Sequence, residues 1–303
     1  MTKTSKKLSA NERLIVSFYI LYLKTISFLN NKLGIYAYGL GFIASKIKFD
    51  FHFVFRNSQF LFSSAAARSY CLLPASIPNE PETHLFIDKI LGNKNNVMFI
   101  DVGASIGEFV IPCANDHRIS KVIAFEPHPV TSLALQNSVA LSLNNKVEII
   151  QKGVSSFSGY ANFDFSEVAP TSAGIHYSAE SKDHDKIEVT TLDDVITSDK
   201  NQNIILLIDI EGGELEALKG GSCLIKNTNP VIIFEYNETT RKFFSLAEAI
   251  DFLGQEYQTY KLCSIDGRLD KNLCSTWNIV AIPTRGPWKK LLEQDDLFVG
   301  KKV

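Results

Sequence analysis

After residue 80 the chain alternates between short apolar runs and amphipathic segments. The runs at 97–101, 123–126, 147–151, 204–209 and 230–235 are apolar at nearly every position. Such runs predict strands buried on both faces. The segments at 83–91, 128–143 and 245–254 have helical spacing instead. Buried strands that alternate with helices predict a doubly wound, mostly parallel α/β sheet.

Four of these strands end in a carboxylate: Asp101, Glu126, Asp209 and Glu235. In open α/β sheets, ligands bind outside the carboxyl ends of the strands. We therefore expect the four acids to converge on one edge of the sheet and to mark the functional site there.

Residues 1–82 have a different pattern, and we interpret them as an N-terminal extension to a domain at 83–303. Apolar residues at helical spacing (Leu14, Phe18, Tyr22, Ile26 and Leu29) predict a helix. Residues 49–64 alternate aromatic and polar positions around Arg56-Asn57-Ser58, which predicts a β-hairpin whose aromatic side chains belong to the core. A long polar segment at 166–186 has no clear period, and a loop of this length is usually functional or disordered. We expect it to form a wall of the pocket, and we leave open a second wall from the N-terminal extension.

Charge separates the two parts. Of the 303 residues, the first 80 contain ten Lys or Arg and three Asp or Glu, whereas the remainder is acidic. Three interpretations of the first helix stay open: packing on the body or on a second subunit, peripheral membrane contact through residues 1–48, and a true span. The five cysteines show no metal-binding spacing, so we expect reduced thiols and a cytoplasmic protein, and we leave membrane association open. We expect no nucleic-acid partner.

A glycine turn follows the first strand. Glycine lets the backbone turn tightly against a ligand, and Gly103 and Gly107 are followed 19 residues later by Glu126. A carboxylate at about that distance accepts both hydroxyls of a ribose. The spacing is G-x-x-x-G and not the G-x-G-x-x-G of dinucleotide sites. S-adenosylmethionine, a cationic nucleoside without phosphate, suits this site.

The order FIDVGASIGEF, VIAFEPHP, VTTLDDVI, LIDIEGGELEALKGG and PVIIFEYN resembles the FkbM family of S-adenosylmethionine-dependent methyltransferases over residues 97–237. The resemblance implies the Rossmann-like class I fold of seven strands, the last inserted antiparallel. It also implies O-methylation of a sugar, glycolipid, polysaccharide or natural product.

The resemblance also implies roles for individual residues. Asp209 and Glu211 match the D-x-E-G segment, whereas Ser105 and Glu108 depart from the usual pattern. The third strand offers no carboxylate for adenine, so we expect a contact near Val154, Ser155 or Ser156. By the same resemblance the cofactor-binding residues are Asp101, Gly103, Ser105, Gly107 and Glu126.

Methyl transfer to a hydroxyl benefits from a base. The candidates are Asp209, Glu235, His128 and His176, and we favour Asp209 because it ends the strand on the acceptor side. Structural roles stay open: Glu211 and Glu214 suit the start of a helix, and His128 suits a turn. Asp209, Glu211 and Glu235 also offer oxygen ligands for Mg²⁺, but the spacing requires no metal.

Two other classes of protein stay open. One is an NAD(P)-dependent or nucleotide-sugar oxidoreductase, which would need the absent G-x-G-x-x-G and a Tyr-x-x-x-Lys pair at the site. The other is a non-catalytic, membrane-associated binding protein. We expect a small-molecule or glycan acceptor as the partner and leave a homo-oligomer open.

Overall fold

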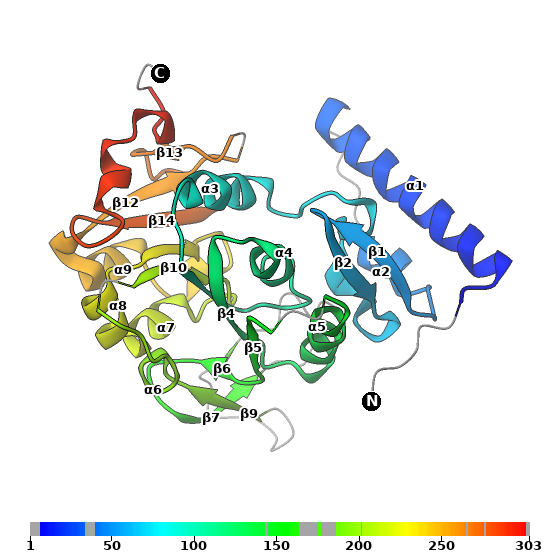
Figure 1. Ribbon diagram of the computed structural model, residues 1–303, viewed down its shortest axis with the longest axis horizontal. Coiled ribbons are helices and arrows are strands. Elements are labelled where there is room, and N and C mark those ends of the chain that lie inside the picture. Colours follow the sequence, from blue (N-terminus) through cyan, green and yellow to red (C-terminus); the bar gives the residue numbers. More distant parts are fainter. Residues whose placement is uncertain are drawn as a thin grey trace.

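The computed structural model describes residues 7–33, 40–142, 145–163, 175–176, 186–200, 202–264, 266–275 and 277–300. Its centre is one sheet with helices on both faces (Figure 1). In spatial order its strands are β13 (Leu269–Asp270), β12 (Tyr257–Leu262), β14 (Asn278–Pro283), β11 (Val231–Glu235), β10 (Asn203–Ile208), β3 (Val97–Val102), β4 (Ile119–Phe125) and β5 (Val147–Ile150).

The topology confirms the α/β fold expected from the sequence. Strands β11, β10, β3, β4 and β5 are parallel to one another, and the last strand, β14, is inserted antiparallel between β11 and β12. The sheet has eight strands where seven were expected. The additional strand is β13, a two-residue strand that pairs with the edge of β12 and extends the seven-stranded arrangement without altering it.

Alternate residues of each central strand enter two separate cores. Val97 and Phe99 of β3 belong to one hydrophobic cluster, and Met98 and Ile100 belong to the other. Both faces of each central strand are therefore buried, which explains why these strands are continuous apolar runs in the sequence. Helices cover both faces: α3 (Pro81–Leu91), α4 (Val110–Asn115) and α5 (Pro129–Leu141) the first, and α6 (Leu192–Val195), α7 (Glu214–Gly220), α8 (Ser222–Thr228) and α9 (Leu246–Leu253) the second.

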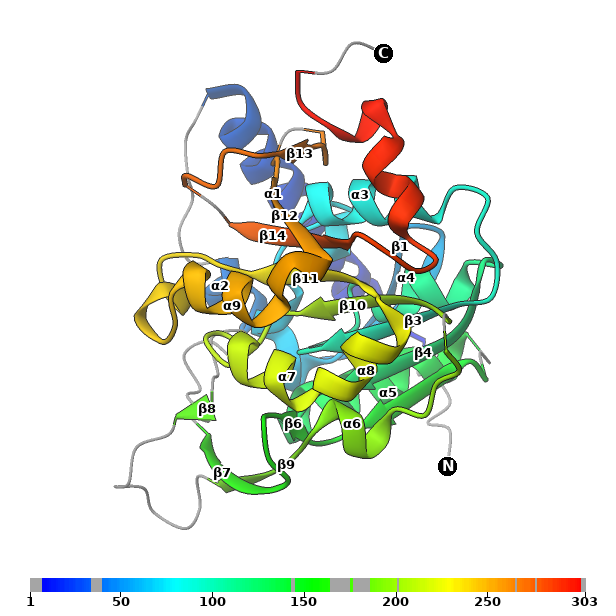
Figure 2. The same ribbon diagram turned by 90° about the vertical axis from the view of Figure 1, so that its left-hand side faces the viewer.

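A second, smaller sheet lies beyond the parallel edge (Figure 2). It is formed by β6 (Gly153–Val154), β9 (Lys186–Thr190), β7 (Gly159–Phe163) and β8 (Ile175–His176), in that order. Most of the segment 166–186, expected to form a functional wall, lies outside the described residues, as does the side chain of His176. Within this segment the structure describes β8 and the first residue of β9, both of which belong to the small sheet.

The N-terminal extension packs on the face that carries α4 and α5. It comprises α1 (Ala10–Leu33), α2 (Leu40–Ala44) and a hairpin of β1 (Phe51–Phe55) and β2 (Ser58–Phe62). Two short 3₁₀ helices, η1 (Ser64–Tyr70) and η2 (Leu73–Ala75), follow. The turn residues Arg56 and Asn57 both have positive φ, which is the conformation of a two-residue hairpin loop. As expected, the hairpin aromatics are buried, and they share one hydrophobic cluster with the main sheet.

Helix α1 confirms the expected helix but not the stripe by which it packs. Tyr19 and Leu23 are buried against the body, whereas Leu14 and Phe18 of the predicted stripe are exposed. The helix has apolar residues on most of its circumference, so spacing alone did not select the buried stripe. By length and composition, residues Ala10–Lys32 could cross a membrane, and 11% of their most apolar stretch is buried.

The shared cluster predicts that the hairpin and the sheet unfold together. Phe62 is fully buried and stacks on Phe51 with ring centroids 4.5 Å apart. Phe62→Ala should cost about 3–5 kcal/mol and lower the midpoint of a single thermal transition. Val54→Ala, on the exposed face of the same hairpin, is the control and should change little. An unchanged transition for the sheet would instead make residues 1–82 an independent domain.

Candidate active site

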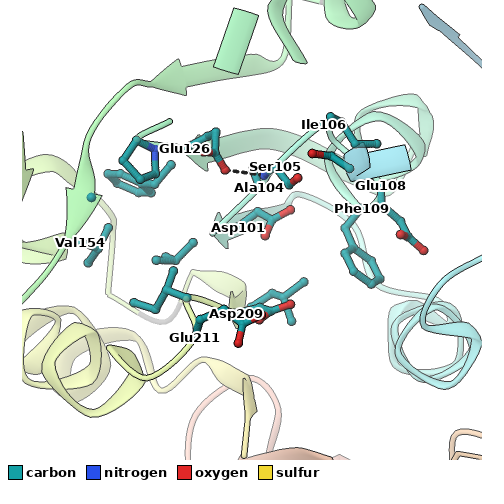
Figure 3. Close-up of a pocket in the computed structure, with 18 of the residues that line it drawn as sticks. Asp101, Ala104, Ser105, Ile106, Glu108, Phe109, Glu126, Val154, Asp209 and Glu211 are labelled. Atoms are coloured by element: carbon teal, nitrogen blue, oxygen red, sulfur yellow. Dashed lines mark hydrogen bonds between the residues drawn. The ribbon is translucent and has the colours of Figure 1, made fainter. Parts of the chain in front are cut away.

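A pocket of about 260 Å³ opens at the carboxyl ends of β3, β4 and β10. Its lining contains six carboxylates and, among the described lining residues, a single basic side chain, that of Lys152. Figure 3 shows Asp101 between Glu126 and Glu108, with Asp209 and Glu211 across the pocket. The structure thus brings Asp101, Glu126 and Asp209 to one rim, as the strand ends predicted.

The two predicted glycines have different roles. Gly103 lines the pocket with φ of +98°, and a Cβ there would lie 1.8 Å from the backbone oxygen of Asp209. Glycine therefore lets the ends of β3 and β10 touch. Gly107 also has positive φ, but its missing Cβ faces Leu135 Cδ1 at 2.5 Å. Because Gly107 has no side chain, α5 can pack closely against the turn. Gly107 is not among the pocket-lining residues.

Glu126 organises the turn after β3 and the start of α5. Its Oε2 accepts a hydrogen bond from the Ser105 backbone N–H at 2.7 Å. Its Oε1 accepts bonds from the His128 N–H at 2.9 Å and the Thr131 hydroxyl at 2.8 Å. Burial raises the pKa of Glu126, and these three donors oppose that shift. The carboxylate is held in place and still borders the pocket.

Asp101 is the most sheltered acid of the pocket. The residue is 2% exposed, and its Oδ2 has no hydrogen-bond partner among the described residues. Burial raises its pKa well above the usual range, and the negative charges of Glu80 and Glu126 add to the effect. A buried oxygen without a partner is costly unless a ligand supplies a donor or a positive charge.

A second group of acids lies across the pocket. Oxygen atoms of Asp209, Glu211 and Glu235 all lie within 4.8 Å of one another. Burial, followed by the charge of Glu211, raises the pKa of Asp209 to about 7. Burial, followed by the charge of Asp209, raises the pKa of Glu235 to about 11, so Glu235 is protonated at neutral pH. Glu235 also accepts a hydrogen bond from Asn237 at 2.5 Å, and it is not among the residues that line the pocket.

The D-x-E-G segment is shaped by an acid that does not line the pocket. Glu214 is fully buried, and its carboxylate accepts hydrogen bonds from the backbone N–H groups of Ile210 and Gly212 at 3.0–3.1 Å. This clamp holds Glu211, whose φ is +56°, toward the pocket. Glu214 thus opens α7, as expected, and also fixes the loop before it.

His128 serves as the N-cap of α5. Its Nδ1 accepts the Val130 N–H at 3.2 Å, and burial lowers its pKa. The ring is outside the lining set. This geometry favours the turn-shaping role over the role of base.

Of the three residues expected near adenine, only Val154 lines the pocket. Val154 lines the pocket together with Phe125 and Phe163, which form an apolar wall. Ser155 donates its N–H to Thr190 O at 2.9 Å, and Ser156 donates its hydroxyl to Glu216 at 2.5 Å, so both serve the small sheet and α7.

A third wall comes from the N-terminal extension, and the sequence did not identify the residues that form it. Ser69, Cys71, Asn79 and Glu80 all line the pocket. Glu80 accepts hydrogen bonds from Thr83 Oγ1 at 2.9 Å and Asn278 Nδ2 at 2.8 Å. Burial, followed by the charge of Asp209, raises its pKa to about 8. No motif surrounds Glu80, so no pattern could have identified it.

Glu108 attaches this wall to the glycine turn. Its two carboxylate oxygens accept hydrogen bonds from the backbone N–H and the side-chain amide of Asn79, at 2.8 and 2.6 Å. Oε1 also lies 3.2 Å from His84 Nε2. The unusual acid at position 108 was the one signal in the sequence, because it provides the partner that the extension needs.

Comparison with known proteins identifies the family of this chain. A family model described as the methyltransferase FkbM domain matches residues 101–262. Hexuronic acid methyltransferase AglP of Haloferax volcanii is 29% identical over 135 residues, which is 44% of this chain and 53% of that protein.

Solved structures with a similar fold include the FkbM methyltransferase from Methylobacillus flagellatus KT, with 17% identity and a TM-score of 0.47 over 72% of this chain and 55% of that one. TYW2 of M. jannaschii in complex with AdoMet has 13% identity and a TM-score of 0.37 over 78% and 85% of the two chains. The chain spans about half the length of AglP and of the FkbM structure. Because the FkbM model matches more than half of the chain and contains most of the pocket's acids, this protein belongs to the FkbM methyltransferase family.

Proposed function

We propose that the protein is an S-adenosylmethionine-dependent O-methyltransferase that acts on a hydroxyl group of a sugar. The observation that carries the proposal is the pocket of six carboxylates at the glycine turn of an FkbM-family domain. An acidic, partly apolar pocket at this edge of the sheet suits a cationic nucleoside.

The residues present fit that cofactor. Asp101 Oδ2, buried and without a partner, suits a cationic group, and Glu126 lies at the strand end where a ribose ligand belongs. Val154 and Phe163 offer an apolar surface for the base. When bound, S-adenosylmethionine supplies an electrophilic methyl group.

The chain's own residues prepare the acceptor. Asp209 faces the pocket and has a pKa of about 7, so near neutral pH much of it is ionised and can accept a hydroxyl proton. Glu235 stays protonated at that pH and therefore does not compete as a base. Glu80, held by Asn278, also borders the pocket, and its pKa of about 8 leaves most of it protonated near neutral pH.

The relative AglP is named for hexuronic acid, which supports a sugar acceptor here. The pocket argues for a sugar without a negative charge, however. Glu108 and Glu211 border it, and a uronate carboxylate would be repelled by their negative charges. We therefore infer a neutral or cationic sugar as the acceptor.

Binding of the cofactor should depend on Glu126. Replacing it by glutamine, Glu126→Gln, removes the charge and disrupts the bonds that shape the turn, so the Kd for S-adenosylmethionine should rise at least about tenfold, or ~1.4 kcal/mol. Isothermal titration calorimetry measures this. Glu148→Gln, an exposed acid on β5 paired with Lys121, is the matched control. Binding of NADH in place of S-adenosylmethionine would favour an oxidoreductase.

Catalysis should depend on Asp209 in its ionised form. Activity (kcat/KM) should rise as pH increases through about 7, because Asp209 must lose its proton before it can act. Asp209→Asn should remove this dependence and lower kcat by about 10²–10⁴. Asp251→Asn, on the exposed side of α9, is the control.

A pH profile that survives Asp209→Asn would assign the base elsewhere. Activity that is lost with EDTA and restored by Mg²⁺ would instead assign Asp209, Glu211 and Glu235 to a metal ion, since their oxygens lie close enough to share one.

The acceptor can be tested on cell-envelope glycans by mass spectrometry, with and without the intact enzyme. We expect loss of one CH₂ of mass from a neutral or amino sugar when the enzyme is inactive. A panel of purified glycosides and glucuronides then compares charge directly. Faster methylation of the glucuronides would contradict the inference from the pocket's charge.

A further inference from the structure

The outer face of α1 carries large apolar side chains that no part of the described structure covers. Phe18, Leu21, Phe28 and Leu14 are between 56% and 63% exposed, and Ile15 is 47% exposed. Phe42 and Ile43 of the next helix, α2, are exposed as well. Figure 1 shows α1 along the outside of the hairpin, away from the main sheet. We refer to Leu14, Ile15, Phe18, Leu21 and Phe28 as the outer α1 face.

These positions form one stripe. Leu14, Phe18, Leu21 and Phe28 are spaced by three, four or seven residues, which places them on the same side of a helix. The opposite side of α1 is occupied: Tyr19 contacts Phe62 edge-to-face with centroids 6.2 Å apart, and Leu23 is fully buried. The helix is therefore fixed to the body by one stripe and presents the other to its surroundings.

Basic residues border this face on one flank and at the end of the helix. Residues 1–48 contain eight Lys or Arg, with Glu12 as their only acid. Arg13 and Lys24 lie on one flank of the outer α1 face by helical spacing, and Lys32 ends the helix. Just after α2, the Nζ of Lys46 lies 4.3 Å from the centroid of the Phe42 ring. Aromatic and aliphatic side chains bordered by cations are typical of a helix that lies in a lipid interface.

We propose that α1 docks the protein on the surface of an anionic lipid bilayer, with the outer α1 face inserted among the headgroups. Two other occupants fit less well. A second copy would bring the same cations against one another, and like charges repel. A transmembrane orientation would pull Tyr19 and Leu23 out of the hydrophobic cluster and place Lys24 within the bilayer.

The docked helix is close in structure to the acceptor side of the pocket. α1 packs against η2, and the chain then continues to Asn79 and Glu80, which line the pocket. Docking would thus hold this wall near the membrane surface. The proposal concerns attachment alone and does not depend on which reaction the pocket performs.

Vesicle flotation of the full-length protein tests the proposal. The protein should float with vesicles of phosphatidylglycerol and phosphatidylcholine, less with phosphatidylcholine alone, and less as salt screens the cations. The double variant Phe18→Asp/Phe28→Asp should partition at least about tenfold less, because two apolar anchors are lost and two negative charges are gained. Leu133→Asp, at an exposed position of α5 (57% exposed), is the control and should float like the unchanged protein.

Circular dichroism melting of each variant verifies that it folds. A folded double variant that floats like the unchanged protein overturns the proposal. A dimer in light scattering that the double variant converts to a monomer, without vesicle binding by either protein, assigns the face to a second copy and also overturns it. Protein that alkaline carbonate cannot extract from vesicles would show a span and would equally contradict surface docking.

Discussion

Burial of several carboxyl groups at one edge of the sheet is the constraint that organises this protein. Asp101, Asp209 and Glu80 are drawn together by strand ends and by the extension, and burial keeps water from screening them. Their raised pKa values mean that protons are taken up when the acids are buried, so this part of the fold loses stability as pH rises through those pKa values. A positively charged group beside these acids would favour their ionised forms and offset part of this cost.

The pocket is not contained in the matched family segment. One wall comes from residues 69–80, and two polar connections attach that segment: Glu108 to Asn79, and Asn278 to Glu80. Glu108 belongs to the turn after β3 and Asn278 to the inserted last strand, so the two ends of the domain converge on the extension. The pocket is therefore lined both by the matched family segment and by residues of the extension before it.

The exposed apolar face of α1 and the acidic pocket are separated by the hairpin. Helix α1 lies outside the hairpin, and the main sheet, at whose edge the pocket opens, lies on the other side (Figure 1). The hairpin between them is a layer of packed aromatic rings continuous with the main core. This packed layer fixes the position of α1 relative to the pocket.

The sequence alone determined the local and periodic features. Fully apolar runs ending in acids predicted the parallel sheet and placed Asp101, Glu126 and Asp209 on one rim, because parallel strands share the edge at which they end. Tertiary structure decided which residues around that rim face the pocket. Gly107 allows α5 to pack and His128 caps it, so neither lines the pocket. Glu235 lies close to Asp209 but outside the lining, and Glu80 reaches the pocket from the extension before β3. It also selected the stripe of α1 that packs on the body. These outcomes depend on contacts between distant segments, which residue spacing within one segment does not encode.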